Sequence, residues 1–510
     1  MNLLFPNGSE RVRELSADTY RHLAVEELTG MIAATEEEKA IVRKVFMSMP
    51  LDPDISEYRR EILTDLLQDE ELCDDLNKVL SQLAILKEFK DNDGFTLRKK
   101  SSLWDMINYM NEMEVYTRII EDLNATFAKH TVTSKGLTEI ADLLKQVIDE
   151  DRVAELKELI DSLRTDMSTL KSVTVGINLN PDLYPADIVI KSFNKEQFAA
   201  NTNKIAWGIS IGAQRVIRYN NPTPFMKHIC EDMERELSRS VRTRKTELKQ
   251  YINLKGYFLL DICDDLRFYL CVAAFARKLK KEQYSICMPV IKTEAKSVNM
   301  QGIYNLRLTA NQTKNIVKND FLFNEKEQMF ILTGPNRGGK TMLTQAIGIN
   351  ALMAAQGLFV AADAYEGYLF DNILTHFPAD ENETLAYGRL GEEAIRVQQI
   401  VKTATSRTLV LLNETYSSTS AYDGLYMATD LVHILKHKNV PMIFNTHIHE
   451  LATRIPEMNH WDGTSDVVSI TMEIVNNVNT FRVLRKEPDN NSYARNIAEK
   501  YGVTYEQMLE

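Results

Sequence analysis

Residues 328–344 constrain the fold more than any other part of the chain. They read QMFILTGPNRGGKTMLT, and 334–341 fit the pattern G-x-x-x-x-G-K-[ST] at every position. The short apolar run 329–333 is typical of a buried strand, and the apolar spacing becomes helical from Lys340 onward. A glycine-rich tight turn is the alternative, but the matched flanks favour the strand–loop–helix unit that binds phosphate.

Each residue type in this loop has a chemical reason. Glycine lets backbone N–H groups approach a polyphosphate, and the following helix directs its positive end at the same charge. Lys340 would reach the β- and γ-phosphates, and Thr341 would place its hydroxyl on Mg²⁺. We therefore predict ATP and Mg²⁺ as cofactors. The predicted loop residues are Gly334, Pro335, Asn336, Arg337, Gly338, Gly339, Lys340 and Thr341.

After the loop, short apolar runs alternate with longer segments of helical spacing. This alternation is typical of a largely parallel sheet with helices on both faces. The expected strands are 358–360, 373–377, 408–412 and 440–444, and the expected helices are 388–405 and 422–436. Residues 467–475 and 480–486 flank an asparagine-rich turn and predict a terminal hairpin. We expect an α/β P-loop NTPase domain.

The N-terminal half has a different pattern. Residues 1 to about 130 are dense in helix formers, and segments such as 58–67 and 76–89 place apolar residues three and four apart, which predicts amphipathic helices. One long helix is expected over 136–170, followed by a small β interlude at 173–179 and 188–193. The region before the P-loop domain is therefore expected to be mainly α-helical.

A second long helix, expected over 225–252, carries a row of cations at helical spacing. A solvated face paired with neighbouring glutamates is the usual explanation of such a row, and contact with a phosphate backbone is the other. The candidates for DNA-backbone contact are Arg235, Arg239, Arg242, Lys245 and Lys249.

Composition limits the partners and the compartment. The chain has 510 residues, which predicts two to four domains, and a formal net charge of -12. A nucleic-acid partner must therefore meet a local basic patch, because the overall field repels it. The five cysteines lie far apart without a C-x-x-C pair, and no stretch reaches the ~18 apolar residues of a membrane span. We expect a cytoplasmic protein without a membrane segment.

Hydrolysis needs a partner for Mg²⁺ and a group that orients water, at the C-terminal end of a strand beside the loop. The run 408–412 is followed by Asn413 and Glu414. Glu414 is the natural water-orienting carboxylate. Asn413 can hydrogen-bond a water on Mg²⁺, which makes it a metal-site candidate beside Thr341, but its amide adds no negative charge. We predict an ATPase with weak Mg²⁺ binding or slow turnover.

Histidines follow the expected strand 440–444. His447 can meet the γ-phosphate and report its presence, so it is a candidate sensor. His433, His437 and His449 allow a zinc interpretation. The sequence has no H-E-x-x-H and no nearby cysteine, and therefore solvated or packed histidines are the better interpretation.

Together these motifs resemble the ATPase domain of the MutS family of DNA mismatch-repair proteins. TGPNRGGKT is similar to that family's TGPNMGGKST, LVLLNETYSSTSAYDG to its LVLMDEIGRGTSTYDG, and FNTHIHEL to its FATHYHEL. IVKND at 316–320 is similar to the family's adenine-side segment, which makes Asn319 a nucleotide-binding candidate. SYARNIAEKYGV near the end resembles the family's SYGIQVAKLAGL. The resemblance covers residues 286 to 505.

The resemblance implies a homodimer whose levers grip DNA, with two ATP sites across the dimer interface and a MutL-like partner. It implies a helical core domain at 1–130, and long lever helices with a small clamp-like β insertion at 131–285. The ATPase domain, with a short C-terminal helical tail, would then occupy 286–510.

The sequence also departs from the family's pattern. Asn413 stands where the family has aspartate, and GRLGEE from Gly388 stands where it has GRSTF, so hydroxyls expected to reach the partner's nucleotide are missing. From the sequence we expect no mismatch-reading domain at the N-terminus, no nuclease domain after Glu510, and no dimerising helix-turn-helix of the family's kind at the C-terminus. We therefore expect recognition of double-stranded DNA that is branched or deformed, by shape and backbone charge and not by mismatch readout.

A second hypothesis is an ATP-gated interaction module that grips protein or structured RNA with little hydrolysis. Asn413, the altered GRLGEE segment and the acidic balance favour it. Measurement of ATP hydrolysis with and without DNA would separate the two hypotheses.

Overall fold

The computed structural model describes residues 2–6, 11–91, 103–169, 171–183, 185–197, 244, 246–311, 313–335, 337–378, 389–476, 478–486 and 507–508. The chain divides into two compact units. The first consists of Met1–Glu70, Thr133–Gly136 and Asp264–Glu510, and the second of Glu71–Val132 and Leu137–Cys263. One cut of this division, at 132/133, lies near the boundary expected at 130, and another, at 263/264, lies before the boundary expected at 285. About seventy N-terminal residues group with the P-loop.

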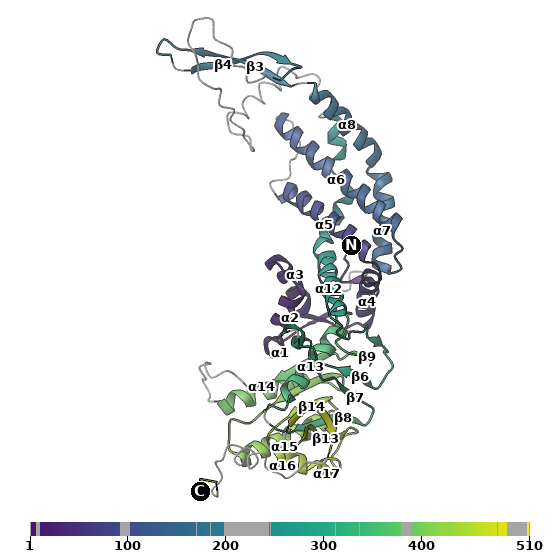
Figure 1. Cartoon of the computed structure of the whole chain (residues 1–510), viewed down its shortest axis with the longest axis vertical. Helices are drawn as coiled ribbons and strands as arrows, with labels where there is room; N and C mark the ends of the chain where they lie inside the picture. The colour runs from purple at the N-terminus through teal and green to yellow at the C-terminus, as the bar shows by residue number, and fades with distance from the viewer. Residues whose placement is uncertain are drawn as a thin grey trace. The chain divides into compact units, whose positions relative to one another are not determined.

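The first unit is built on a six-stranded sheet in the order β10-β11-β12-β8-β13-β14. Three of its strands, β8, β13 and β14, are labelled in Figure 1. β10, β11, β12, β8 and β13 run parallel, and β14 runs antiparallel to β13. The expected sheet and terminal hairpin are therefore confirmed, with one antiparallel edge. The strands are β8 (Glu327–Thr333), β10 (Asn372–His376), β11 (Thr408–Asn413), β12 (Met442–Asn445), β13 (Asp466–Val475) and β14 (Val478–Arg485).

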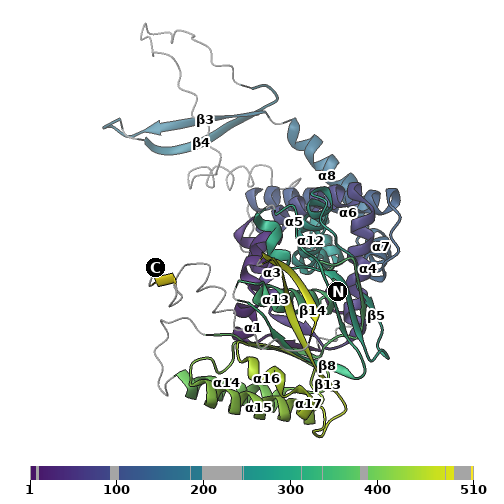
Figure 2. The same cartoon turned by 60° about the horizontal axis from the view of Figure 1, so that its bottom comes forward.

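Helices cover both faces of this sheet. α13 (Lys340–Ala355) packs on one face, where Gly348 lies so close to Leu411 of β11 that an added Cβ would be 2.7 Å from its side chain. On the other face, Ile331 and Leu412 share a buried core with four helices, which Figure 2 shows together. Because successive strand residues point to opposite faces, β8 and β11 bury both. The four helices are α14 (Arg389–Thr403), α15 (Ala421–His437), α16 (His449–Thr453) and α17 (Ile455–Met458).

A second sheet in the same unit has the order β5-β9-β6-β7. Its strands are β5 (Val290–Ile291), β6 (Val298–Ile303), β7 (Asn319–Phe323) and β9 (Ala364–Gly367). The strand expected at 358–360 is wrong, because Val360 forms only an isolated bridge with Cys287. These residues are nevertheless fully buried, which explains their apolar composition.

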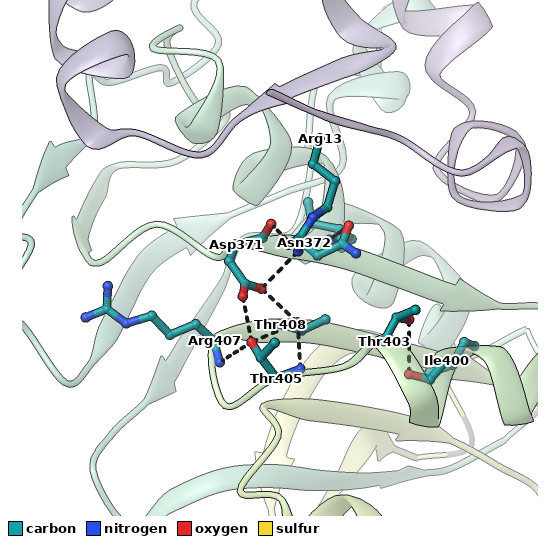
Figure 3. A network of polar contacts seen from close by, with 9 residues as sticks. Arg13, Asp371, Asn372, Ile400, Thr403, Thr405, Arg407 and Thr408 are labelled. Carbon is teal, nitrogen blue, oxygen red and sulfur yellow. Dashed lines mark hydrogen bonds and ion pairs between the residues drawn. The ribbon is translucent and has the colours of Figure 1, made fainter. Parts of the chain in front are cut away.

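The N-terminal segment of the first unit is fastened to the edge of the six-stranded sheet. The Arg13 guanidinium donates a hydrogen bond to the Asp371 carbonyl oxygen at 2.9 Å, and the hydroxyls of Thr405 and Thr408 donate to the Asp371 carboxylate at 2.6 and 2.7 Å (Figure 3). The segment contains β1 (Val12–Glu14), α1 (Ala17–His22), α2 (Val25–Ile32), α3 (Glu36–Phe46), β2 (Ser48–Pro50) and α4 (Pro53–Gln68), with β1 and β2 paired antiparallel.

Helices and one hairpin make up the described part of the second unit. The elements are α5 (Glu70–Asp91), α6 (Leu103–Lys129), α7 (Lys135–Glu150), α8 (Val153–Ser168), β3 (Ser172–Leu179), β4 (Pro185–Asn194) and α11 (Phe258–Asp261), after which α12 (Cys263–Lys281) leads into the first unit. The expected β interlude is confirmed as the antiparallel pair β3–β4. Within the described ranges, no helix is long and apolar enough to cross a membrane.

The single helix expected over 136–170 is wrong. Arg152 adopts a left-handed conformation, with φ at 50°, and separates α7 from α8. The Asp151 carboxylate accepts hydrogen bonds from the backbone N–H groups of Lys255 and Gly256 at 2.9 and 3.0 Å. These contacts hold the chain at the point where the helix is interrupted.

The row of cations falls largely outside the described residues. Arg235, Arg239, Arg242 and Lys245 lie there, and Lys249 begins a 3₁₀ turn, Lys249–Tyr251. The α-helix expected to continue to residue 252 therefore gives way to a 3₁₀ turn at Lys249.

Candidate functional site

A pocket of about 450 Å³ lies where β8 leads into α13. Polar loop residues line one part of it, and apolar side chains such as Ile303, Leu308 and Val317 line another. Of the predicted site residues, it is lined by Asn319, Pro335, Arg337, Gly338, Gly339, Lys340, Thr341, Glu414 and His447. Gly334 lies at the start of the loop and Asn413 contacts Thr341, whereas Asn336 lies outside the described residues.

Two glycines of the loop adopt a conformation that other residues rarely take. Gly334 has φ at 132° and Gly339 has φ at 94°, both in the region that favours glycine. A Cβ at Gly334 would lie 3.1 Å from the Met472 backbone nitrogen, and one at Gly339 would lie 3.1 Å from the Phe481 ring. The loop therefore lies so close to the β13–β14 hairpin that a side chain at either position would crowd the hairpin.

Lys340 lies at the first position of α13 with its side chain folded under the loop. Its Nζ donates hydrogen bonds to the carbonyl oxygens of Gly334 and Pro335 at 3.0 and 3.1 Å, and the residue is 5% exposed. Burial lowers the pKa of Lys340 to about 8, against a weaker opposing effect of Glu414. A phosphate in the pocket would meet this buried ammonium directly.

Thr341, Asn413 and Asn445 form a neutral polar cluster beside the loop. The Thr341 hydroxyl donates to Asn413 Oδ1 at 3.1 Å, and Asn445 Nδ2 donates to the same oxygen. Asn413 and Asn445 are register partners at the ends of β11 and β12. Hydroxyl and amide oxygens are hard ligands that suit Mg²⁺ directly or through water, so the cluster fits the ion. None of the three side chains carries a negative charge, and weak Mg²⁺ binding stays a prediction.

Glu414 and His447 meet at the pocket from the ends of adjacent strands. His447 Nε2 lies 3.0 Å from Glu414 Oε1. This hydrogen bond lowers the pKa of Glu414 below its ordinary value, although burial acts in the opposite direction. The carboxylate is therefore ionised at neutral pH, as a water-orienting group must be. The catalytic role of Glu414 and the sensor role of His447 stay predictions.

Asn319 lies at the pocket wall, but its side chain is engaged by β14. Its Nδ2 donates to the Phe481 carbonyl oxygen at 3.1 Å, and its Oδ1 accepts from the Val483 backbone N–H at 2.7 Å. Asn319 thus fastens β7 to the terminal hairpin. A direct contact of Asn319 with the nucleotide stays a prediction.

Sequence reasoning missed Asn445 and His376. Asn445 is the last residue of β12, two residues before His447, and the comparison of FNTHIHEL with FATHYHEL could have singled it out. His376 ends β10 and lies 2.9 Å from the Thr415 hydroxyl, a contact that no local pattern indicates. Of the histidines considered for zinc, His433 packs against Trp461 with ring centroids 4.5 Å apart. The described residues contain no group of three or more His, Cys, Asp or Glu arranged to hold a metal ion.

Comparisons with known families match both halves of the chain. The family model for MutS domain V matches residues 330–508, and the model for the MutS2 N-terminal domain matches residues 51–282. The first range contains the P-loop, Glu414 and His447.

Individual relatives share about a quarter to less than a third of the aligned residues with this chain. The chain is 24% identical over 507 residues to a DNA mismatch repair protein MutS from Chlorobaculum parvum, covering 96% of this chain and 54% of that protein. The protein of the same name from Thermotoga maritima is 24% identical, over 87% of this chain and 51% of its own length. The protein of the same name from Chlorobium phaeobacteroides is 29% identical, over 47% of this chain and 27% of its own length. The chain thus spans about half the length of the first two of these relatives.

Proposed function

The chain belongs to the MutS family, and from this premise we propose that it binds ATP in the P-loop pocket and hydrolyses it. The observation that carries the proposal is the convergence of Lys340, Thr341, Glu414 and His447 on one pocket. Its apolar part suits a flat base, and its loop suits a charged phosphate chain. The match to MutS domain V over the same residues supports this assignment.

Each polar group then has a task. The loop N–H groups and the Lys340 ammonium bind the phosphates. On binding, the ammonium gives up its hydrogen bonds to the Gly334 and Pro335 carbonyl oxygens and donates to phosphate oxygens. Thr341, and Asn413 through water, would hold Mg²⁺, which would supply positive charge beside the β- and γ-phosphates. Glu414 orients the attacking water, and His447 holds the Glu414 carboxylate in place beside the γ-phosphate.

We further propose that the ATP state controls a grip on DNA by the helical region. This region matches the MutS2 N-terminal domain, and the relatives are named as DNA mismatch repair proteins. In this proposal the helices α5 to α8 serve as levers and β3–β4 belongs to a clamp-like insertion. The chain acts as a homodimer, works with a MutL-like partner, and binds branched or deformed duplexes without reading mismatches.

A specific observation favours a second candidate function. The cluster of Thr341, Asn413 and Asn445 is neutral, whereas strong Mg²⁺ sites usually include a carboxylate. An ATP-gated module that grips protein or structured RNA, with little turnover, would be built in this way. Copurification from cells with nuclease treatment of the eluate would reveal such a partner.

The decisive experiment measures ATP hydrolysis by the full chain with Mg²⁺, alone and with linear or branched duplex DNA. Lys340→Ala is the blank, and Lys326→Ala, which removes an exposed lysine away from the pocket, is the matched control. We expect turnover that DNA changes, loss of turnover in Lys340→Ala, and little change in Lys326→Ala. Turnover that survives in Lys340→Ala would reject the P-loop pocket as its source.

A further inference from the structure

The loop that carries Glu414 has a strained backbone. Glu414 has φ at 52° and Tyr416 has φ at 65°, so two residues other than glycine adopt left-handed conformations on either side of Thr415. Such conformations persist only where the surrounding structure holds them. The direction of the Glu414 carboxylate therefore depends on what anchors this loop.

Backbone contacts provide part of the anchor. The Glu414 N–H donates to the Asn445 carbonyl oxygen at 2.8 Å, and the Ser417 N–H donates to the Glu414 carbonyl oxygen at 3.1 Å. These bonds fix where the loop leaves β11 and how tightly it turns. Neither of these two bonds involves the side chain of Thr415, which lies between Glu414 and Tyr416.

Thr415 is tied to the neighbouring strand β10. Its hydroxyl lies 2.9 Å from His376 Nδ1, and the two residues are 0% and 2% exposed. Burial lowers the pKa of His376 to about 4, so the ring is neutral at physiological pH and pairs with the hydroxyl as an uncharged partner. A hydrogen bond between two fully buried side chains limits the conformations that the loop can adopt.

The end of β10 is itself held by the N-terminal helix α1. His22 Nδ1 lies 2.8 Å from the Thr375 hydroxyl, and the His22 ring stacks on Phe377 with centroids 4.8 Å apart. Gln345 of α13 donates from Nε2 to the His22 carbonyl oxygen at 2.7 Å. A continuous set of contacts thus joins the helix after the P-loop to the strand that carries His376.

We propose that His376, acting through the Thr415 hydroxyl, is a positioning residue for Glu414, and that α1 braces this contact against the P-loop helix. The inference rests on the proposed ATPase function and adds a determinant of its rate. His376 and Thr415 touch no reacting group, so their loss changes the aim of the carboxylate and leaves the phosphate site intact.

The test uses the full chain with Thr415→Val, which keeps the shape and removes the hydroxyl, and Thr415→Ser, which keeps the hydroxyl. Thr415→Val should lower kcat by about tenfold to a hundredfold, because small misplacements of a catalytic group have effects of this size. KM for ATP and the Kd of a fluorescent ATP analogue should change by less than about twofold, because the substitution removes no contact with the bound nucleotide. Thr415→Ser should recover most of kcat.

Two further variants separate positioning from a general loss of packing. Thr126→Val removes a part-buried hydrogen bond in the other unit, which the Thr126 hydroxyl donates to the Asp122 carbonyl oxygen at 2.8 Å, and should leave kcat unchanged. His376→Leu should lower kcat as Thr415→Val does, and the double variant should be no slower than either single one, because both remove the same contact. Thermal unfolding monitored by circular dichroism confirms that each variant is folded during the assay.

The outcomes are distinguishable. Turnover in the wild-type chain together with an equal kcat in Thr415→Val overturns the inference and leaves the proposed function standing. Three other outcomes also overturn it. They are an equal loss of kcat in Thr415→Val and Thr415→Ser, additive losses of kcat in the double variant, and a loss of kcat accompanied by an equal loss of nucleotide affinity. Absence of turnover in the wild-type chain overturns both.

Discussion

At the residue scale, the Lys340 ammonium is buried, and among the described residues it donates its hydrogen bonds to two uncharged carbonyl oxygens. Its pKa of about 8 lies below the ordinary value of 10.5. A bound triphosphate favours the charged form and raises this pKa, so binding above pH 8 takes up a proton and the affinity for ATP falls as the pH rises further.

Calorimetry slightly above pH 8, in buffers of different ionisation enthalpy, measures this proton uptake. ATP itself is fully deprotonated there and does not contribute. Lys340→Arg is the control, since a guanidinium stays protonated and should bind without proton uptake. Binding enthalpies that are independent of the buffer in the wild-type chain would contradict the prediction.

Asn413 leaves the Mg²⁺ site without a carboxylate. Asn413→Asp places a charge and a second oxygen beside the Thr341 hydroxyl, which now contacts an amide oxygen at 3.1 Å. We expect the Mg²⁺ concentration for half-maximal nucleotide binding to fall by at least about tenfold. A tenfold change corresponds to about 1.4 kcal/mol, and a unit charge about 4 Å from another is worth about 1–4 kcal/mol. Titration of Mg²⁺ against a fluorescent ATP analogue measures it.

The matched variant is Asn445→Asp, which adds the same charge one strand away. It is expected to gain less, because the Thr341 hydroxyl donates to Asn413, whereas the Asn445 side chain is joined to the cluster through its own donation to Asn413. Equal gains at the two positions would mean that net charge matters and the position at the end of β11 does not.

At the element scale, Asp371 fastens β1 to the start of β10. Asp371→Ala leaves the Thr405 and Thr408 hydroxyls without their shared acceptor (Figure 3) and should cost about 1–3 kcal/mol of stability. Arg13→Ala removes a partly exposed ion pair of 3.8 Å and the hydrogen bond to the Asp371 carbonyl oxygen at 2.9 Å, and should cost less than about 1 kcal/mol. Urea unfolding followed by tryptophan fluorescence compares them, and a larger loss in Arg13→Ala would refute this order.

The elements also show what a sequence can predict. β8, β11 and β12 are buried on both faces, and such strands leave continuous apolar runs that end in polar residues. The run 358–360 has the same composition and is equally buried, but it belongs to no sheet. Apolar composition therefore predicts burial more reliably than strand pairing.

The features that the sequence did not predict depend on contacts between residues far apart in the chain. The phosphate loop is local in sequence, so its residues could be assigned without the fold. The interruption at Arg152 depends on Lys255 and Gly256, about a hundred residues away, and the pairing of Asn413 with Asn445 depends on the order of the strands. The contact of His376 with Thr415 likewise requires β10 to lie beside β11.

At the scale of the whole molecule, a net charge of -12 works against the proposed grip on DNA. Binding must then come from a local row of cations that releases counterions from the duplex, and its affinity falls linearly with salt on logarithmic axes. The candidate row contains Arg239 and Arg242, both outside the described residues. If both contact phosphates, replacing them with alanine should reduce the slope by about two, since each contact contributes about 0.9.

Fluorescence anisotropy with a branched duplex over a range of salt concentrations measures the slope for the wild-type chain and for Arg239→Ala/Arg242→Ala. The control is Lys296→Ala/Lys326→Ala, which changes the net charge equally through two exposed lysines of the P-loop unit. A reduced slope in the arginine variant alone locates the contacts in the row. Equal reductions in both variants would mean that the overall field governs binding, and an unchanged slope in both would remove the row from the proposed DNA interface.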